Sequence, residues 1–345
     1  MPKTLLNTLY VQSQGAYLHL ESDTIKVEVE GELKARVPLH HIGGIVVFGN
    51  VLLSPFLIGK LSTEGKSVTW LANSGRFQAQ AHGPQSGNIL LRQAQFEAGR
   101  QPHVCTELTR RILAGKLQNA RSTLLRAARE STTVSDQTAL RASAEAHATA
   151  IRKLPNTNTV DELRGLEGEA AAQYFRVFTH MIRVQREDFY FHARIKRPPR
   201  DAINALLSFI YALLTTDCVA ALQGVGLDPQ LGFLHAVRPG RPSLALDLLE
   251  EYRSPIGDRL ALTLVNRQQI QPKHFEAREG GAVMLNEDGR KIVLVAYQER
   301  KKETLIHPFT GHVTPVQLIP HVQARLLAKT LRGDLETYPP FILRG

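Results

Sequence analysis

Cysteine is nearly absent from this 345-residue chain, which holds only Cys105 and Cys218. Two cysteines in a chain of this length make no disulfide scaffold, and no C-x-x-C pair offers a zinc site. Apolar runs are also short, since none approaches the ~20 residues that a helix needs to span a bilayer. Met1 to Thr8 lack the charged start, long apolar stretch and cleavage site of a signal peptide, so we expect a cytoplasmic protein without a membrane partner.

Acidic residues are too few to balance the basic ones. The chain has 42 Lys and Arg against 32 Asp and Glu, a formal net charge of +10. This excess favours polyanionic partners, chiefly nucleic acid, although a protein can be basic without binding one. Residues 1–95 hold eight Lys/Arg and six Asp/Glu, a net of +2, so +8 lies in the remainder. The length corresponds to about two domains.

Residues 1–95 are predicted to form a small β domain with one inserted helix. Residues 25–30 alternate apolar and polar side chains, the pattern of a half-buried strand. Residues 45–49 form a short continuous apolar run and 67–71 read as a further strand, while 55–62 fit one short helix. The sequence contains no internal repeat and no low-complexity tract.

Beyond residue 92 the composition shifts to Ala, Arg, Gln, Glu and Leu, which are good helix formers. Thr159 is expected to cap a helix over residues 160–184. Residues 201–222 are strongly apolar at helical spacing, which predicts a central buried helix, and 316–331 predict a helical tail. The fold class is therefore α+β, with a helical second domain after the β-rich one.

One segment of the second domain is predicted to be a β-hairpin. Residues 282–285 are apolar, residues 291–295 are apolar except for Lys291, and Asn286-Glu287-Asp288-Gly289 lies between them. Asp-Gly suits the tight turn of a hairpin. We assign this hairpin no functional role.

Glu167 is the first candidate for chemistry, because it lies between two glycines within a helical pattern. Each glycine costs ~1 kcal/mol relative to alanine there, which is tolerable where something must approach the backbone closely. The alternative is a loose helix start with a solvated Glu167. Glu169 is a competing carboxylate in the same segment.

His235 and the carboxylates Asp247 and Glu250 are the remaining candidates. His235 ends an apolar stretch, where a histidine is more often structural than a ligand. Asp247 and Glu250 lie three residues apart in a Leu-rich segment, so they share one helix face at or beside an apolar surface. Buried carboxylates need a partner or a metal, although the face can also be a solvated edge.

Together these side chains make a plausible metal site. Carboxylates with one imidazole suit Mg²⁺ or Mn²⁺, and the histidine favours Mn²⁺. Arg238, Arg241 and Arg253 lie three to six residues from the proposed ligands, so they could clamp a phosphate beside the ion.

The motifs, in this order, resemble the CRISPR-associated Cas1 family over nearly the whole chain. The resemblance rests on Val37-Pro38-Leu39 and the apolar run at residues 45–49, the Arg164–Gly168 motif, residues 201–207 with Tyr211, Gly232–His235, and the Ser-Leu-x-x-Asp-Leu-x-Glu run from Ser243 to Glu250. The Arg238–Arg241 turn is most similar to subtype I-C members.

The resemblance implies a β-rich dimerisation domain at residues 1–95 and a helical metal-binding catalytic domain at 96–345. It selects Glu167 over Glu169 and implies that Glu167, His235 and Glu250 are metal ligands supported by Asp247. It further implies a homodimer, a small Cas2 partner, and double-stranded spacer and repeat DNA as substrates. The residues predicted to contact DNA are Arg238, Arg241, Arg253 and Tyr211.

The implied reaction is transesterification in antiviral CRISPR adaptation, in which a duplex 3′-hydroxyl attacks a phosphodiester of the repeat array. Hydrolysis is the same chemistry with water as the nucleophile, so endonuclease activity is expected too. Two alternatives stay open: a metal-dependent nuclease without an integration role, and a non-catalytic DNA-binding scaffold.

Overall fold

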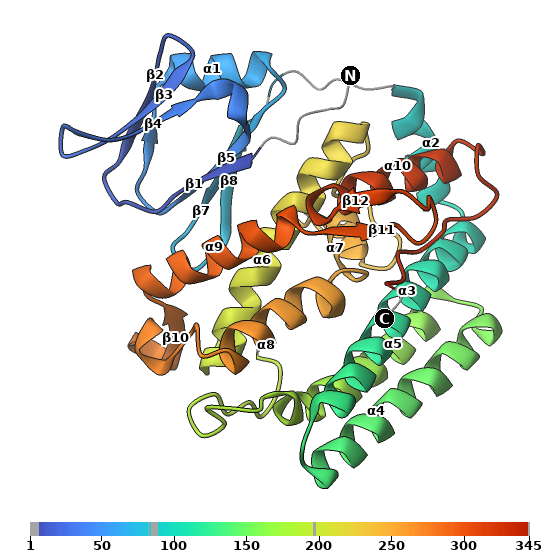
Figure 1. The fold of residues 1–345 in the computed structure, drawn as a ribbon. Helices are drawn as coiled ribbons and strands as arrows, with labels where there is room; N and C mark the ends of the chain where they lie inside the picture. The colour runs from blue at the N-terminus through green and yellow to red at the C-terminus, as the bar shows by residue number, and fades with distance from the viewer. Residues whose placement is uncertain (1–6, 82, 84–88, 196–197, 344–345) are drawn as a thin grey trace. The chain divides into compact units, whose positions relative to one another are not determined.

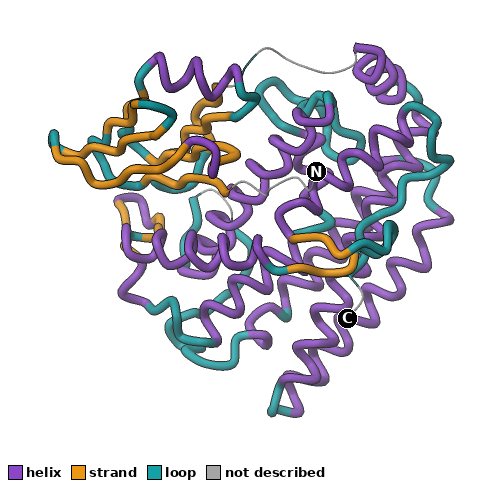
Figure 2. The backbone as a smooth tube through the Cα atoms, turned by 45° about the horizontal axis from the view of Figure 1, so that its top comes forward, coloured by secondary structure: helices purple, strands orange, loops and turns teal. Residues whose placement is uncertain are grey.

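The chain folds into two compact units, Met1–Ser86 and Gly87–Gly345. The structure is a computed structural model that describes residues 7–81, 83, 89–195 and 198–343. Strands dominate the described part of the first unit and helices dominate the second (Figures 1 and 2), which confirms the predicted α+β class. The predicted boundary near residue 95 falls inside helix α2 (Ile89–Gly99), because the first turns of that helix precede the shift in composition.

The first unit contains two four-stranded sheets. One has the order β1-β5-β7-β8, in which β5 (Ile42–Phe48) pairs in parallel with both β1 (Asn7–Val11) and β7 (Ser67–Leu71), and β8 (Phe77–Ala81) closes the edge antiparallel to β7. The buried apolar run of β5 follows from its place between two parallel neighbours.

The second sheet has the order β4-β3-β2-β6. Its strands are β2 (Tyr17–Glu21), β3 (Thr24–Val29), β4 (Glu32–Pro38) and β6 (Leu52–Leu53). The predicted alternation in β3 is confirmed, because Ile25 and Val27 are buried and lie in the unit's core. Glu30 and Gly31, both with positive φ, make the β3–β4 turn.

The inserted helix α1 (Pro55–Thr63) is confirmed. Ser54 caps it, since its hydroxyl oxygen accepts a hydrogen bond from the Leu57 N–H at 3.2 Å, and Pro55 occupies the first turn. Leu57 and Leu61 are buried in the same core as the strands.

Helices form most of the second unit. Beyond α2, their bounds are α3 (Pro102–Glu130), α4 (Val134–Lys153), α5 (Val160–Arg176), α6 (Ala202–Val225), α7 (Ser243–Leu249), α8 (Arg259–Asn266), α9 (Glu287–Lys302) and α10 (Ile319–Leu331). A π-helical segment, η4 (Arg253–Asp258), leads into α8, and the short strand pairs β9 (Phe275–Arg278) with β10 (Ala282–Leu285) and β11 (Thr304–Ile306) with β12 (Val313–Pro315) complete the unit.

Helix α6 is the central buried helix that the sequence predicts. Asp201 caps its start by accepting from the Asn204 N–H at 2.7 Å, and Gly226 ends it in the left-handed conformation. Contrary to the sequence expectation, α6 is long and apolar enough to span a membrane by length and composition, and no other helix among the described residues is. Its apolar window is 61% buried inside the protein, as in a core helix.

Two predicted elements of the second unit are wrong in extent or type. The predicted hairpin at 282–296 is a strand followed by α9, because Asn286 caps the helix by accepting from the Gly289 N–H. Glu287 and Asp288 then lie in the first helical turn, where the helix dipole favours carboxylates. Helix α5 ends at Arg176 instead of continuing to residue 184, since a 3₁₀ turn begins at Phe178.

Candidate functional site

Glu167 projects from α5, whose start is fixed by Thr159. The Thr159 hydroxyl accepts from the Glu162 N–H at 3.2 Å, which confirms the predicted cap. A Cβ at the neighbouring Gly165 or Gly168 would meet no atom within 4 Å, so no described part of the chain makes the close approach considered for these glycines. Both faces beside Glu167 are therefore open.

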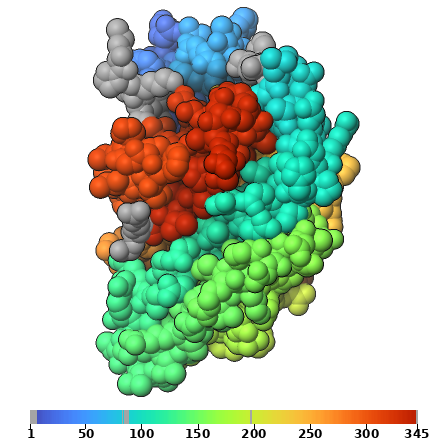
Figure 3. Space-filling model, turned by 90° about the vertical axis from the view of Figure 1, so that its right-hand side faces the viewer, coloured from blue at the N-terminus to red at the C-terminus, as the bar shows by residue number. Residues whose placement is uncertain are grey.

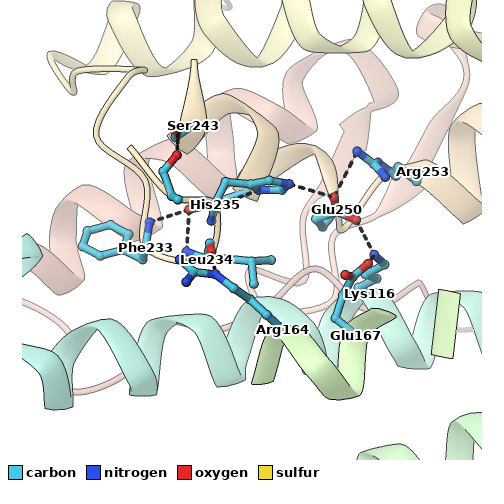
Figure 4. A network of polar contacts seen from close by, with 11 residues as sticks. Lys116, Arg164, Glu167, Phe233, Leu234, His235, Ser243, Glu250 and Arg253 are labelled. Atoms are coloured by element: carbon cyan, nitrogen blue, oxygen red, sulfur yellow. Dashed lines mark hydrogen bonds and ion pairs between the residues drawn. The ribbon is translucent and has the colours of Figure 1, made fainter. Parts of the chain in front are cut away.

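Lys116 on α3 is a central side chain of the site that sequence reasoning missed. Its ammonium contacts Glu167 Oε1 and lies 2.7 Å from Glu250 Oε2, although the residue is only 9% exposed (Figure 4). It thus bridges two carboxylates that come from different helices. The available signal was a lysine flanked by buried apolar positions, Leu113 and Leu117, on one helix face.

Asp247 on α7 anchors the loop that carries His235. One carboxylate oxygen, Oδ2, accepts from the backbone N–H groups of Phe233 at 2.6 Å and Leu234 at 3.0 Å. The other, Oδ1, accepts from the His235 N–H at 2.9 Å and is 2.7 Å from His235 Nδ1. Because Asp247 is fully buried, it holds the imidazole through Nδ1 and leaves Nε2 for the site.

The loop needs glycine at position 232 to reach Asp247. A Cβ there would lie 2.7 Å from the Ser243 carbonyl carbon and 2.8 Å from Asp247 Oδ2. Arg164 on α5 fastens the same loop, since its Nε donates to the Leu234 carbonyl at 2.7 Å (Figure 4). The helix that carries Glu167 and the loop that carries His235 are therefore tied together.

Glu250 follows the last residue of α7 and is buried among positive groups. It lies 3.1 Å from Arg253, 2.7 Å from Lys116 and 3.8 Å from His235 Nε2. Burial by itself would raise the pKa of Glu250, but the charges of Arg253 and Lys116 outweigh burial and lower this pKa to about 2. Glu250 is consequently a carboxylate at neutral pH.

The residue after Glu250 is fastened by the C-terminal segment. Glu251 Oε1 accepts from the Tyr338 hydroxyl and Oε2 from the Phe341 N–H, both at 2.8 Å. Asn119, one turn beyond Lys116 on α3, donates to the carbonyls of Glu251 at 2.9 Å and Phe341 at 2.8 Å. Figure 3 shows the C-terminal residues (red) against α2 and α3 (cyan). These bonds hold the two site elements at a fixed separation.

A pocket of ≈ 600 Å³ opens beside Lys116 and Glu167. Tyr211, a predicted DNA contact, lines it but is only 8% exposed. Its hydroxyl donates to Asp258, and Arg253 lies over its ring at 5.2 Å from the centroid. The DNA contact of Tyr211 stays a prediction.

The three predicted phosphate-binding arginines occupy two different settings. Arg238 is exposed and Arg241 half-buried, on a turn closed by the Arg241 N–H bonding to the Arg238 carbonyl at 3.0 Å, with Gly240 at positive φ. Arg253 instead lies in the site, where it pairs with Glu250. In the structure, Arg253 therefore serves as a counter-charge to Glu250.

The donor set fits a divalent ion in its chemistry. Among the described residues, no group of three or more His, Cys, Asp and Glu is arranged to hold a metal. The Lys116 ammonium contacts both Glu167 and Glu250. However, Glu250 Oε2 is buried and makes no well-aligned hydrogen bond even with Lys116 Nζ nearby. Two carboxylates and the free Nε2 of His235 are ligands that Mg²⁺ or Mn²⁺ accepts.

Comparison with known proteins gives the same family across the chain. The family model described as CRISPR associated protein Cas1 matches residues 9–299. A CRISPR-associated endonuclease Cas1 of Moorella thermoacetica is 48% identical over 340 residues, covering 99% of each chain, and one of Chlorobaculum tepidum is 47% identical over 342 residues, covering 99% of this chain and 100% of that one. The structure of a Cas1 protein from Thermotoga maritima, 25% identical, superposes with a TM-score of 0.80 over 95% of this chain and 97% of that one. The chain belongs to the CRISPR-associated Cas1 family.

Proposed function

We propose that this protein is a metal-dependent DNA endonuclease and integrase that inserts spacer DNA into a CRISPR array. The observation that carries the proposal is that Glu167 and Glu250 both contact the Lys116 ammonium and that His235 Nε2 lies 3.8 Å from Glu250, with a pocket beside Lys116 and Glu167. Relatives of this chain that are named CRISPR-associated endonucleases support the nuclease part. Subtype I-C stays a prediction.

The roles of the side chains follow from their contacts. Asp247 holds the Nδ1 side of His235, so Nε2 keeps a lone pair directed at Glu250. Glu167, His235 and Glu250 would hold Mg²⁺ or Mn²⁺, an ion that lowers the pKa of an attacking hydroxyl and neutralises charge on the phosphoryl oxygens. Lys116 and Arg253 are positive groups within reach of the same carboxylates, so they would stabilise charge that develops on a bound phosphate.

The substrate we propose is double-stranded DNA with a free 3′-hydroxyl, attacking a phosphodiester of the repeat. Net charge of +8 in residues 96–345 supports backbone binding. Arg238 and Arg241 on their turn after His235 are proposed phosphate contacts. The pocket that Tyr211 and Arg253 line is proposed to take DNA next to the reacting group.

The proposed assembly is a homodimer joined through residues 1–95, together with a Cas2 partner, in the cytoplasm. A chain of a solved Cas6-RT-Cas1–Cas2 complex shares this fold with a TM-score of 0.80, which supports the Cas2 partner. Exposed apolar side chains of the first unit support dimerisation there; they are Tyr17, Leu33, Leu52, Phe56 and Phe77. A monomer in light scattering at micromolar concentration would contradict the dimer.

A strand-joining assay tests the reaction. Labelled duplexes ending in a 3′-hydroxyl or in a 3′-deoxy terminus are incubated with repeat DNA, Cas2 and Mn²⁺, with EDTA in parallel. We expect joining only with the hydroxyl and the ion, and its loss in Glu167→Gln. The matched control Glu169→Gln, which alters an exposed carboxylate on the same helix, should join normally.

The same assay separates the two alternatives. Cleavage that persists without any joining, in the presence of Cas2, would favour a nuclease with no integration role. Binding of duplex without cleavage or joining under Mg²⁺ or Mn²⁺ would favour a DNA-binding scaffold.

A further inference from the structure

A second pocket of ≈ 260 Å³ is lined by residues of the C-terminal half of α3, of α8 and of the segment after α5. Four arginines line it: Arg126, Arg183, Arg259 and Arg267. None of them belongs to the candidate site or was singled out by the sequence motifs. The pocket is smaller than the ~300 Å³ at which small-molecule sites begin, so it suits a compact ligand group.

Positive charge in this arginine pocket is largely uncompensated. Its single lining carboxylate, Glu130, is shared by Arg126 at 2.7 Å and Arg183 at 3.5 Å. Within the part of the chain that the structure describes, the guanidinium groups of Arg259 and Arg267 form neither a hydrogen bond nor an ion pair. Two planar donor groups are therefore available to an anion.

Arg259 is held in the pocket at an electrostatic disadvantage. Burial lowers its pKa, and the charges of Arg126 and Arg300 lower it further. Glu303, another acidic neighbour, is already paired with Arg300. An anion in the pocket would relieve this repulsion, since a guanidinium fork binds phosphate oxygens through two parallel hydrogen bonds.

The walls of the pocket are pre-formed, which favours a binding site over a chance gap. Asn266 on α8 donates to the Met181 carbonyl at 2.9 Å and accepts from the Arg183 N–H at 2.8 Å. Within α8, the Thr263 hydroxyl donates to the Arg259 carbonyl at 2.7 Å. The segment that carries Arg183 and the helix that carries Arg259 are therefore fixed to each other without using either guanidinium.

We propose that the arginine pocket binds a backbone phosphate of duplex DNA, as a contact separate from the candidate active site. This proposal rests on the proposed function. Arg126 follows Lys116 by ten residues of α3, which corresponds to ~15 Å along the helix axis. A duplex lying along α3 would place a phosphate in the pocket about four base pairs from the reacting one, at ~3.4 Å per base pair.

The test is duplex binding by fluorescence anisotropy as a function of salt, with the full-length chain in EDTA so that no turnover occurs. The double variant Arg259→Gln/Arg267→Gln removes both unpaired guanidiniums. The control Arg152→Gln/Lys153→Gln removes the same charge from exposed positions at the end of α4. We expect the pocket variant to bind about tenfold more weakly, with a log K against log salt slope smaller by roughly 0.9, and the control to match wild type.

If the pocket variant and the control bind duplex DNA with equal affinity and equal salt slope, the proposal is overturned. This holds even if the pocket variant no longer binds an acidic protein. If the double variant fails to fold, judged by circular dichroism, the exposed Arg267→Gln alone decides by the same criterion. Joining by the wild-type protein is measured in parallel. Its absence would count against the proposed function, whereas the binding comparison decides the pocket independently.

Discussion

Replacing Asp247 by asparagine should lower stability and slow the reaction, because it weakens the hold on His235 and its loop. The two oxygens of Asp247 receive four donors: three backbone N–H groups of the loop and the Nδ1 side of His235. An ionised carboxylate offers about four acceptor positions, so all are used. Asparagine keeps one oxygen and presents an NH₂ group to the donors that faced the other.

The magnitude follows from that count. At least two hydrogen bonds to a charged acceptor are lost, each contributing about 1.5–3 kcal/mol, so unfolding free energy should fall by about 3 kcal/mol or more. That corresponds to ~6–12 °C in melting temperature for a domain of this size. If the amide NH₂ faces Nδ1 of His235, the ring proton moves to Nε2 and the lone pair needed for an ion is lost.

Cleavage and joining rates measured across a Mn²⁺ titration are the assay. We expect Asp247→Asn to act about 10- to 100-fold more slowly and to need more Mn²⁺, as is typical when a group that orients a metal ligand is changed. Glu169→Gln serves as the control for altering a carboxylate near the site. A folded Asp247→Asn protein with the wild-type rate and Mn²⁺ requirement would refute the role that we derive for Asp247.

Three further predictions concern the charges around the site. The variant Lys116→Met removes the ammonium between two carboxylates, so its unfolding free energy in EDTA should be lower by about 3–5 kcal/mol. Mn²⁺ should raise the melting temperature of this variant more than that of wild type. An equal effect of Mn²⁺ on both proteins would mean that Lys116 and the ion do not share a place. Burial raises the pKa of Asp258 to about 6, with hydrogen bonds from Tyr211 and Tyr174 opposing it. The stability that protonated Asp258 contributes is present below about pH 4 and is lost as the pH rises through 6. Wild type should therefore lose about 3 kcal/mol of unfolding free energy across that window, whereas Asp258→Asn should not. Parallel curves of stability against pH for the two proteins would contradict this. Arg238→Ala and Arg241→Ala should each weaken binding to all duplex sequences equally and flatten the slope of log K against log salt by roughly 0.9. Arg253→Ala should mainly slow turnover, because Arg253 pairs with Glu250. Unchanged slopes for Arg238→Ala and Arg241→Ala would identify both as solvated loop residues.

Local patterns sufficed for elements in which one physical signal acts alone. The alternation in β3, the apolar run of β5 and the Thr159 cap of α5 were each readable, because period and capping chemistry are properties of neighbouring residues. The Asn286–Gly289 segment was not, since Asp-Gly fits a hairpin turn and Asn-Glu-Asp fits a helix start equally well. There the contacts of the following helix decide: Val293, Leu294 and Tyr297 are buried, so a helical face packs against the core.

Sequence resemblance was enough to single out Glu167, His235, Asp247 and Glu250 as a group. The structure brings Glu167 and Glu250 to Lys116, and His235 lies between Glu250 and Asp247. Lys116 itself could not be singled out. It is one of several basic residues on α3, and its partner Glu167 is 51 positions away in the chain. Only folding reveals that this lysine is buried between two carboxylates.

The sequence by itself determined the α+β class, the family and the identity of the candidate ligands, because these depend on residue type, order and short-range period. The tertiary structure decided how the charges are balanced. It placed Lys116 against both Glu167 and Glu250, turned Nδ1 of His235 toward Asp247, and left the Arg259 guanidinium without an ion pair among the described residues. Such contacts join residues that lie far apart in the chain, and Coulomb and hydrogen-bond energies depend on distances that no local pattern encodes.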